Sequence, residues 1–260
     1  MWECPDLFKL DGERVLSISP QGVKANGLDY WNIYQSGYYL LEGDFKGEYA
    51  LGDFRELDRG FDFYAPQTFE DEQGRRILIG WMGLPDCEAQ YHNPTVEKGW
   101  QHCLTLPRQL HIKENKVYQM PIKELEALRK GNNVYAVEEK ALLDGFALEE
   151  IVVTDIDDSK DFEMILENNM TLSYTRADQV FSLQFLNESG AGRDKRMVNL
   201  SGLQSLRIYR DHSSLEVFIN EGEEVFSTRY YPQEEVYTIS IQCKEAEITV
   251  WELGEMSYGK

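Results

Sequence analysis

The sequence predicts an all-β protein in two parts, 1–120 and 132–260, joined by a short helix at 121–131. Short apolar, alternating stretches separated by turn residues fill the first part, a pattern typical of strands. The same pattern returns after residue 132, and a run of strong helix formers with helix-ending residues lies between the two parts. Strands of this length in series are typical of propeller blades, a barrel or a sandwich.

The first part contains the clearest turn residues. The expected strands cover 7–10, 14–19, 34–41, 75–82, 103–110, 110–113 and 116–118. The pair Asp11-Gly12 between two apolar runs predicts a hairpin, and Glu114-Asn115 predicts another.

The segment 121–131 has the features of a helix that connects two domains. Pro121 stands where the first turn lacks a partner for its N–H, and Gly131 is expected to end the helix. Ile122, Leu125 and Leu128 fall on one face. The second part then predicts a two-sheet sandwich. Its expected strands are 146–153, 161–167, 171–176, 180–186, 205–210, 214–219, 224–230, 236–243 and 246–253, with a hairpin turn at Asn220-Glu221-Gly222.

Composition excludes several classes of partner. The chain carries 46 acidic and 26 basic residues, a formal net charge of -20. Such a chain repels phosphate backbones and anionic lipid heads, so neither nucleic acid nor a membrane is expected as a partner. No signal peptide and no run of membrane-spanning length is found. The four cysteines, Cys4, Cys87, Cys103 and Cys243, are scattered. Their spacing favours a reduced, cytoplasmic setting over a disulfide framework or a metal site.

Glu3 is the candidate for acid–base chemistry. It lies between Trp2 and the Cys4-Pro5 pair at the start of an alternating stretch. A carboxyl crowded by apolar neighbours loses hydration, which disfavours its charged form and suits it to donate a proton near neutral pH. The alternative is a solvated glutamate at a frayed terminus. An internal echo supports the functional interpretation, because residues 2–8 and 61–69 both place an acid beside aromatics with proline a few positions later.

Several motifs together resemble glycoside hydrolase family 32, the β-fructofuranosidases, and in particular its bacterial sucrose-6-phosphate hydrolases. They are Trp2-Glu3-Cys4-Pro5-Asp6, 60–69 (GFDFYAPQTF), 79–82 (IGWM), 99–100 (GW) with 104–110 (LTLPRQL), and 206–211 (LRIYRD) with 214–220 (SLEVFIN). The resemblance covers essentially the whole chain. It implies the last blades of a five-bladed β-propeller followed by a β-sandwich.

The resemblance also implies a retaining mechanism, in which one carboxylate attacks the anomeric carbon and another protonates the leaving oxygen. Glu3 then corresponds to the general acid/base, with Cys4 adjusting its environment. Tyr64 and Trp81 correspond to the lining of the fructose pocket, and Asp62 lies beside them. The alternatives are a core role for Trp81 and a satisfied turn or buried hydrogen bond for Asp62. The chemistry requires no cofactor and no metal.

One departure from the family limits the prediction. The family's nucleophilic aspartate belongs to an Asn-Asp-Pro motif, and this sequence contains none. Its Arg-Asp pairs, Arg193-Asp194 and Arg210-Asp211, lie in the expected sandwich rather than in the propeller. We therefore expect about two of five blades, negligible hydrolysis by the chain alone, and self-association through exposed blade faces.

Two functions from different classes remain open at this point. The first is cleavage of β-fructofuranosides, with sucrose 6-phosphate or sucrose as substrate, and with levan or inulin not excluded. The second is a non-catalytic carbohydrate-binding or interaction protein derived from the same family. The presence of a phosphate on the substrate cannot be decided from these residues.

Overall fold

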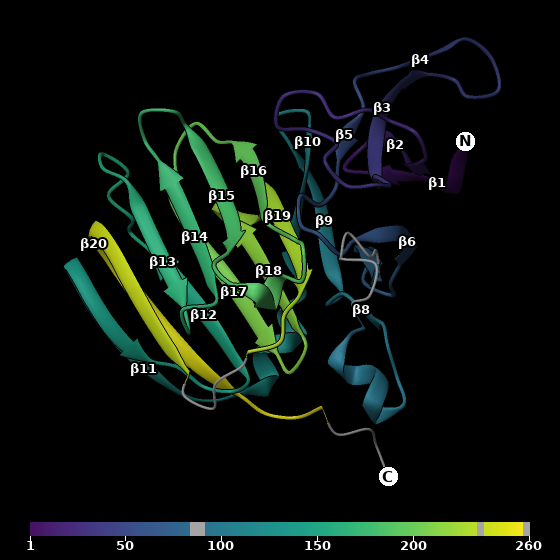
Figure 1. The fold of residues 1–260 in the computed structure, drawn as a ribbon. Helices are drawn as coiled ribbons and strands as arrows, with labels where there is room; N and C mark the ends of the chain where they lie inside the picture. Colours follow the sequence, from purple (N-terminus) through teal and green to yellow (C-terminus); the bar gives the residue numbers. More distant parts are fainter. Residues whose placement is uncertain (84–91, 233–236, 257–260) are drawn as a thin grey trace.

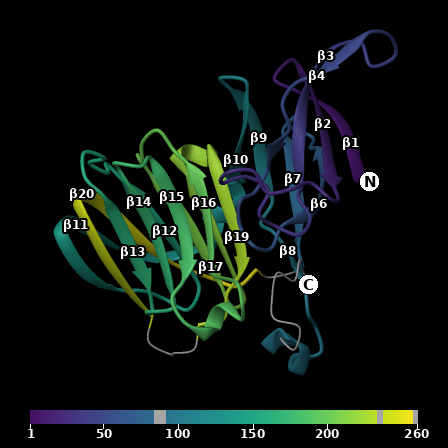
Figure 2. The same ribbon diagram turned by 45° about the horizontal axis from the view of Figure 1, so that its top comes forward.

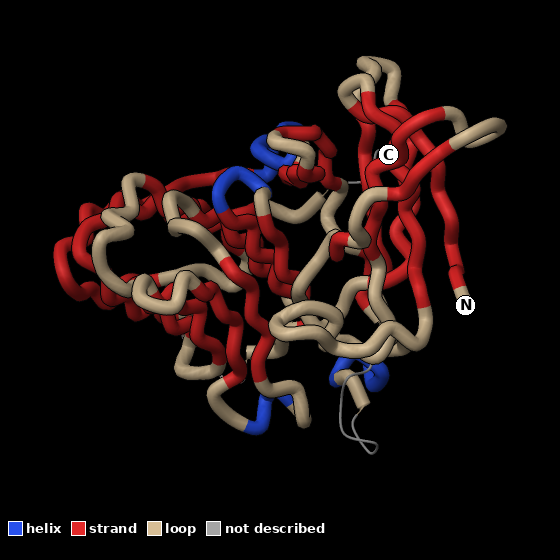
Figure 3. Tube along the Cα trace, turned by 90° about the horizontal axis from the view of Figure 1, so that it is seen from above, coloured by secondary structure: helices blue, strands red, loops and turns tan. Residues whose placement is uncertain are grey.

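A computed structural model of the chain describes residues 1–83, 92–232 and 237–256, and it is all-β. The strands form three antiparallel sheets, two in the N-terminal part and one in the C-terminal part (Figure 1). Viewed from above, the two parts lie side by side, and the helical segments are short turns between strands (Figure 3). In the described ranges, no helix has the length and apolar character needed to cross a membrane. Cys87 and Val236 lie outside these ranges.

The first sheet follows the order β1-β2-β3-β4, with β5 also paired to β3. Its strands are β1 (Trp2–Leu10), β2 (Glu13–Pro20), β3 (Gly37–Gly43), β4 (Tyr49–Leu51) and β5 (Arg55–Glu56). The predicted hairpin at Asp11-Gly12 is confirmed, since Leu10 pairs with Glu13. Both turn residues have positive φ, 49° and 94°, which a two-residue turn between twisted strands requires.

The second sheet follows the order β10-β9-β7-β6, with β8 also paired to β7. Its strands are β6 (Tyr64–Glu70), β7 (Arg76–Met82), β8 (Cys103–Leu104), β9 (Arg108–Lys113) and β10 (Lys116–Pro121), and η1 (Pro94–Lys98) precedes β8. The turn predicted at Glu114-Asn115 is confirmed, because Lys113 pairs with Lys116. Strands β1 and β6 lie against each other, so the two sheets share one small core around Phe8, Phe63 and Leu110.

The predicted connecting helix is shorter and tighter than expected. It is a 3₁₀ helix, η2 (Lys123–Leu128), and Gly131 lies within a strand rather than at a helix end. Two features explain the difference. Leu125 is buried in a cluster with Tyr209 and Phe218. From Arg129 onward the backbone pairs with the last strand of the protein. Tertiary pairing thus overrides a local preference for helix.

The C-terminal part is one ten-stranded, hydrogen-bonded sheet, whereas the sequence analysis expected two separate sheets. Its order is β16-β15-β14-β13-β20-β12-β17-β18-β19, with β11 also paired to β20. The strands are β11 (Arg129–Asp144), β12 (Glu149–Thr154), β13 (Phe162–Leu166), β14 (Met170–Thr175), β15 (Val180–Phe185), β16 (Lys195–Asn199), β17 (Leu206–Asp211), β18 (Ser214–Ile219), β19 (Glu224–Arg229) and β20 (Thr238–Leu253), with short turns η3 (Glu188–Gly190) and η4 (Asn220–Gly222).

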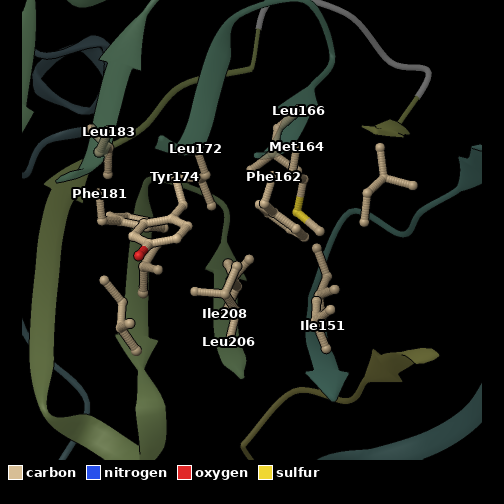
Figure 4. Packing of buried hydrophobic residues seen from close by; sticks show 14 of the residues in the cluster. Ile151, Phe162, Met164, Leu166, Leu172, Tyr174, Phe181, Leu183, Leu206 and Ile208 are labelled. Atoms are coloured by element: carbon tan, nitrogen blue, oxygen red, sulfur yellow. The ribbon is translucent and has the colours of Figure 1, made fainter. Parts of the chain in front are cut away.

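Strand β20 links the two halves of this sheet. Its first residues pair with β13 and its last with β12, so the strands expected at 236–243 and 246–253 are one strand where described. Strands β11 and β16 were not predicted. The two halves curve toward each other (Figure 2), and side chains of β13–β15 pack against those of β12 and β17 (Figure 4). Ile151, Leu172, Leu183 and Ile208 are fully buried there.

A loop of the N-terminal part covers the free edge of β19. Arg59 N–H donates to Val225 O at 2.7 Å, and Asp62 N–H donates to Ser227 O at 3.0 Å. In return, the Asp58 carboxylate accepts from Ser227 N–H at 2.8 Å. An edge strand with unpaired N–H and C=O groups invites pairing with another chain. Here the loop hydrogen-bonds to the edge in place of another chain, and it thereby joins the two parts of the protein.

Candidate active site

A β-bulge sets the position of Glu3. In the β1–β2 ladder Glu3 pairs with Ser19 and Asp6 pairs with Ser17, so Cys4 and Pro5 together lie opposite one residue. Cys4 adopts a positive φ of 47°. Bulges of this kind bend a strand and redirect its side chains, and they are over-represented beside active sites.

The echo noticed in the sequence has a structural counterpart in β6. Tyr64 pairs with Trp81 and Gln67 pairs with Ile79, so Ala65 and Pro66 form a second bulge of the same kind. Ala65 has a positive φ of 48°, close to the 47° of Cys4. Each bulge is a left-handed residue followed by proline. Glu3 and Tyr64 therefore occupy equivalent positions on two adjacent strands.

These equivalent side chains meet. The Tyr64 hydroxyl donates to Oε2 of Glu3 at 2.6 Å, and Nε2 of Gln21 donates to the same oxygen at 2.9 Å. Among the described residues, no hydrogen bond reaches Oε1 of Glu3. Two donors on one oxygen stabilise a carboxylate once its proton has left. In the described ranges the other oxygen has no such partner, as a general acid/base that must exchange its proton requires.

Tyr64 stays protonated and acts as a donor in this arrangement. Burial raises the pKa of its phenol well above the ordinary value, and the hydrogen bond and charge of Glu3 raise it further. The ring of Tyr34 packs against it, with 5.8 Å between centroids. Because this phenol does not ionise near neutral pH, it keeps donating its hydrogen bond to Glu3 there.

Trp81 supplies an accessible aromatic surface beside this pair. It lies opposite Tyr64 in the β6–β7 ladder and is 36% exposed. The ring of His102 packs edge-on against its indole, with 4.9 Å between centroids. Gly83 also touches the indole, since a Cβ there would lie 2.3 Å from the ring. The indole is therefore held in orientation by these contacts, while the residue stays partly exposed.

Comparison with known proteins decides the family. The model of the glycosyl hydrolases family 32 N-terminal domain matches residues 1–121, and that of the family 32 C-terminal domain matches residues 124–252. The chain belongs to glycoside hydrolase family 32.

Individual relatives agree with the family models. The chain is 40% identical over 262 residues to sucrose-6-phosphate hydrolase of Bacillus subtilis, covering 97% of this chain and 54% of that protein. It superposes on the Bombyx mori β-fructofuranosidase BmSUC1, a variant solved with sucrose, at a TM-score of 0.85 and 28% identity, covering 98% and 55%. Sucrose-6-phosphate hydrolase of Lactobacillus gasseri gives 0.85 at 25% identity, covering 98% and 55%. The chain thus spans about half the length of these relatives.

Asp62 lies in the family's motif, but its contacts lead to the C-terminal part. Its Oδ2 accepts from Arg229 N–H at 2.8 Å and pairs with Arg193 Nη1 at 2.9 Å. Asp62 is 3% exposed. Its carboxylate therefore joins the two parts of the chain. Binding of sugar by Asp62 stays a prediction without a supporting contact. Cys4 contributes its backbone oxygen, which accepts from Gln67 Nε2 at 3.4 Å.

Gln21 is a site residue of this family 32 chain that was not predicted from the sequence. It follows β2, where its backbone N–H bonds to Met1 O at 2.8 Å. The Asp11-Gly12 turn indicates which residues of the first two strands lie opposite each other. Counting pairs back from that turn places the residues after Pro20 opposite the residues before Glu3.

The titration of His102 tests how far solvent is excluded around Trp81. Burial lowers the pKa of its imidazole, and the nearby positive charge of Arg229 lowers it further. We expect its NMR titration to fall below the ordinary histidine value of 6.5, with assignment by a His102→Gln variant. Because the folded pKa is lowered, His102 favours the folded state above 6.5 and loses that contribution as the pH falls below it. A midpoint at or above 6.5 would contradict the burial described here.

Proposed function

We propose that this chain takes part in the hydrolysis of β-fructofuranosidic bonds, with sucrose 6-phosphate or sucrose as substrate, by a retaining mechanism. The observation that carries the proposal is the 2.6 Å hydrogen bond from Tyr64 to Glu3 beside the accessible indole of Trp81. The family membership supports it, as do the names of relatives that act on sucrose or its phosphate.

In this mechanism Glu3 donates the proton on Oε1 to the glycosidic oxygen as the bond to the anomeric carbon breaks. Tyr64 and Gln21 hold Oε2 and stabilise the charge that develops on the carboxylate. Later Glu3 takes a proton from water, which attacks the covalent intermediate. The face of Trp81 suits the C–H surface of a fructose ring. The proposed sugar pocket consists of Tyr64, Trp81 and Cys4. Asp62 is added to it on the basis of the motif alone.

The proposed mechanism needs a second carboxylate roughly 5–5.5 Å from Glu3 to attack the anomeric carbon. The family's Asn-Asp-Pro motif is absent from this sequence, and the relatives are about twice as long. We propose that the two N-terminal sheets are blades of a five-bladed propeller and that the ten-stranded sheet corresponds to the sandwich. The three remaining blades would supply the nucleophile.

The direct test is fructose release from sucrose and from sucrose 6-phosphate by the purified chain. We expect no measurable turnover above a buffer control, because a donor without a nucleophile cannot form the glycosyl intermediate. Turnover that disappears in a Glu3→Gln variant would overturn this expectation. Sugar binding without turnover, lost in a Trp81→Ala variant, would favour the second candidate, a carbohydrate-binding protein. The partial exposure of Trp81 is the observation that supports this candidate.

Self-association through the N-terminal sheets is a further part of the proposal. Strands β1 and β6 end their sheets and expose Trp2, Leu7 and Phe69 by 55%, 44% and 49%. Exposed apolar side chains on strands that end their sheets favour contact with another surface. Small-angle scattering is expected to give a mass above one chain that falls to one chain in a Leu7→Lys, Phe69→Lys variant. A monodisperse single chain for the unmodified protein would refute this.

A further inference from the structure

A polar cavity of about 230 Å³ lies at the junction between the N-terminal sheets and the C-terminal sheet. Its lining includes Tyr38 of β3, Arg55 of β5, Lys116 at the start of β10, Glu223 just before β19 and Glu224 at the start of β19. None of Glu3, Tyr64 or Trp81 lines it. Its volume is below the roughly 300–1,000 Å³ of drug-sized sites, so it has room for one small ligand.

The charges around the cavity balance. Its lining includes three cations and three carboxylates, namely Arg55, Arg59, Lys116, Glu56, Glu223 and Glu224. An anion would meet the carboxylates and a cation would meet the arginines and the lysine, so neither gains a net electrostatic advantage. Among the described residues, no cluster of three or more histidine, cysteine or acidic side chains is suited to hold a metal ion. The lining therefore favours a neutral ligand.

Most of the charged groups bind one another, but Arg55 differs. Arg59 pairs with Glu56 at 2.6 Å and with Glu224 at 3.3 Å, and Lys116 pairs with Glu224 at 2.6 Å. Arg55 donates through Nη1 to the Asn115 carbonyl at 2.6 Å, and its side chain also forms a hydrogen bond with Tyr38. In the described part of the chain it takes part in no ion pair. Guanidinium has five N–H donors, so Arg55 keeps donors for a ligand.

We propose that this cavity binds one neutral, polyhydroxylated molecule of monosaccharide size. Each hydroxyl of such a ligand both donates and accepts, so it can bond to the N–H groups of Arg55 and Lys116 and to the carboxylates of Glu223 and Glu224. The site bridges the two parts of the chain and is separate from the Glu3–Tyr64–Trp81 group. It does not depend on the proposed hydrolysis.

The test is titration of the purified chain with D-fructose and with D-glucose, followed by calorimetry and by amide shifts in NMR spectra. We expect ligand-dependent shifts at Tyr38 and Val117, two residues that line the cavity. An Arg55→Met variant should weaken this binding about tenfold or more, the loss typical of a hydrogen bond from a charged donor. Trp81→Ala should leave it unchanged. The matched control is Arg75→Met, which removes an arginine that pairs with Asp71 and Glu124 outside the cavity.

Three results would overturn the proposal. The first is binding that Trp81→Ala abolishes and Arg55→Met leaves intact, because the sugar would then occupy only the proposed active site. The second is displacement of the sugar by inorganic phosphate at the Tyr38 and Val117 amides, which would assign the cavity to an anion. The third is the absence of sugar-dependent shifts at these amides in the unmodified protein. The shifts are measured without a variant, so the test stands even if Arg55→Met fails to fold.

Discussion

Replacement of Arg108 by methionine is expected to lower the free energy of unfolding by about 3–5 kcal/mol, the cost of removing one partner from a buried ion pair. Arg108 is 0% exposed and pairs with Glu216 at 2.6 Å and with Asp58 at 3.0 Å. It also donates to Gln119 and to the Ser227 hydroxyl. Without the guanidinium, two carboxylates stay buried between the two parts of the chain with no cation beside them.

The loss is expected to depend on pH. Burial raises the pKa of both Asp58 and Glu216, and Arg108 acts in the opposite direction. Without Arg108 their folded pKa values rise further. Groups with a raised folded pKa keep their contribution below the unfolded values, near 4, and lose it as the pH rises through the folded values. The destabilisation should therefore be smaller in acid than near neutral pH.

Urea denaturation of Arg108→Met and of the parent chain at several pH values measures this difference. Arg75→Met serves as the control, because Arg75 forms its ion pairs at the surface, where such pairs contribute about 0–1 kcal/mol. A loss below about 1 kcal/mol for Arg108→Met, similar to the control, would show that the buried network does not hold the two parts together.

Arg108 also shows what the sequence can and cannot predict. It lies in one of the motifs that indicated the family, yet nothing around it in the sequence shows that it is buried. Its partners Asp58 and Glu216 are 50 and 108 positions away. Local turn chemistry, in contrast, predicted the hairpins at Asp11-Gly12 and Glu114-Asn115, because two adjacent residues with positive φ determine each turn. Long-range ionic contacts have no comparable local pattern.

Strand β11 was not predicted because it, too, depends on a partner that is distant in the sequence. Its 16 residues are mostly exposed and about half of them are polar, so the apolar alternation that identified the other strands is weak. It is held by pairing with β20 along nearly its whole length, and that partner lies about a hundred residues later. The helix formers before Gly131 then gave a misleading local indication. The contacts of Asp62 with Arg193 and Arg229 also span more than a hundred positions, so no local pattern predicts them.

The other large effect is expected at Glu3 once a nucleophile is supplied. We expect a fusion of this chain to the part of the Bacillus subtilis relative that it does not cover to release fructose from sucrose 6-phosphate. Glu3→Gln in that fusion should lower kcat by roughly 10²–10⁴-fold, the usual contribution of general acid–base catalysis. Glutamine keeps the size of the side chain and can still meet Tyr64, but its amide has no acidic proton to transfer to the leaving oxygen.

Substrates with different leaving groups separate a chemical role from a structural one. A fructoside with an acidic, activated leaving group needs little protonation, so Glu3→Gln should lower its cleavage far less than that of sucrose 6-phosphate. Tyr64→Phe and Gln21→Leu remove one donor each from Oε2 and should give intermediate losses of about tenfold, the value of one hydrogen bond to a charged group. Equal losses for both classes of substrate would mean that Glu3 only supports the fold, and the β1 bulge would then have no catalytic purpose.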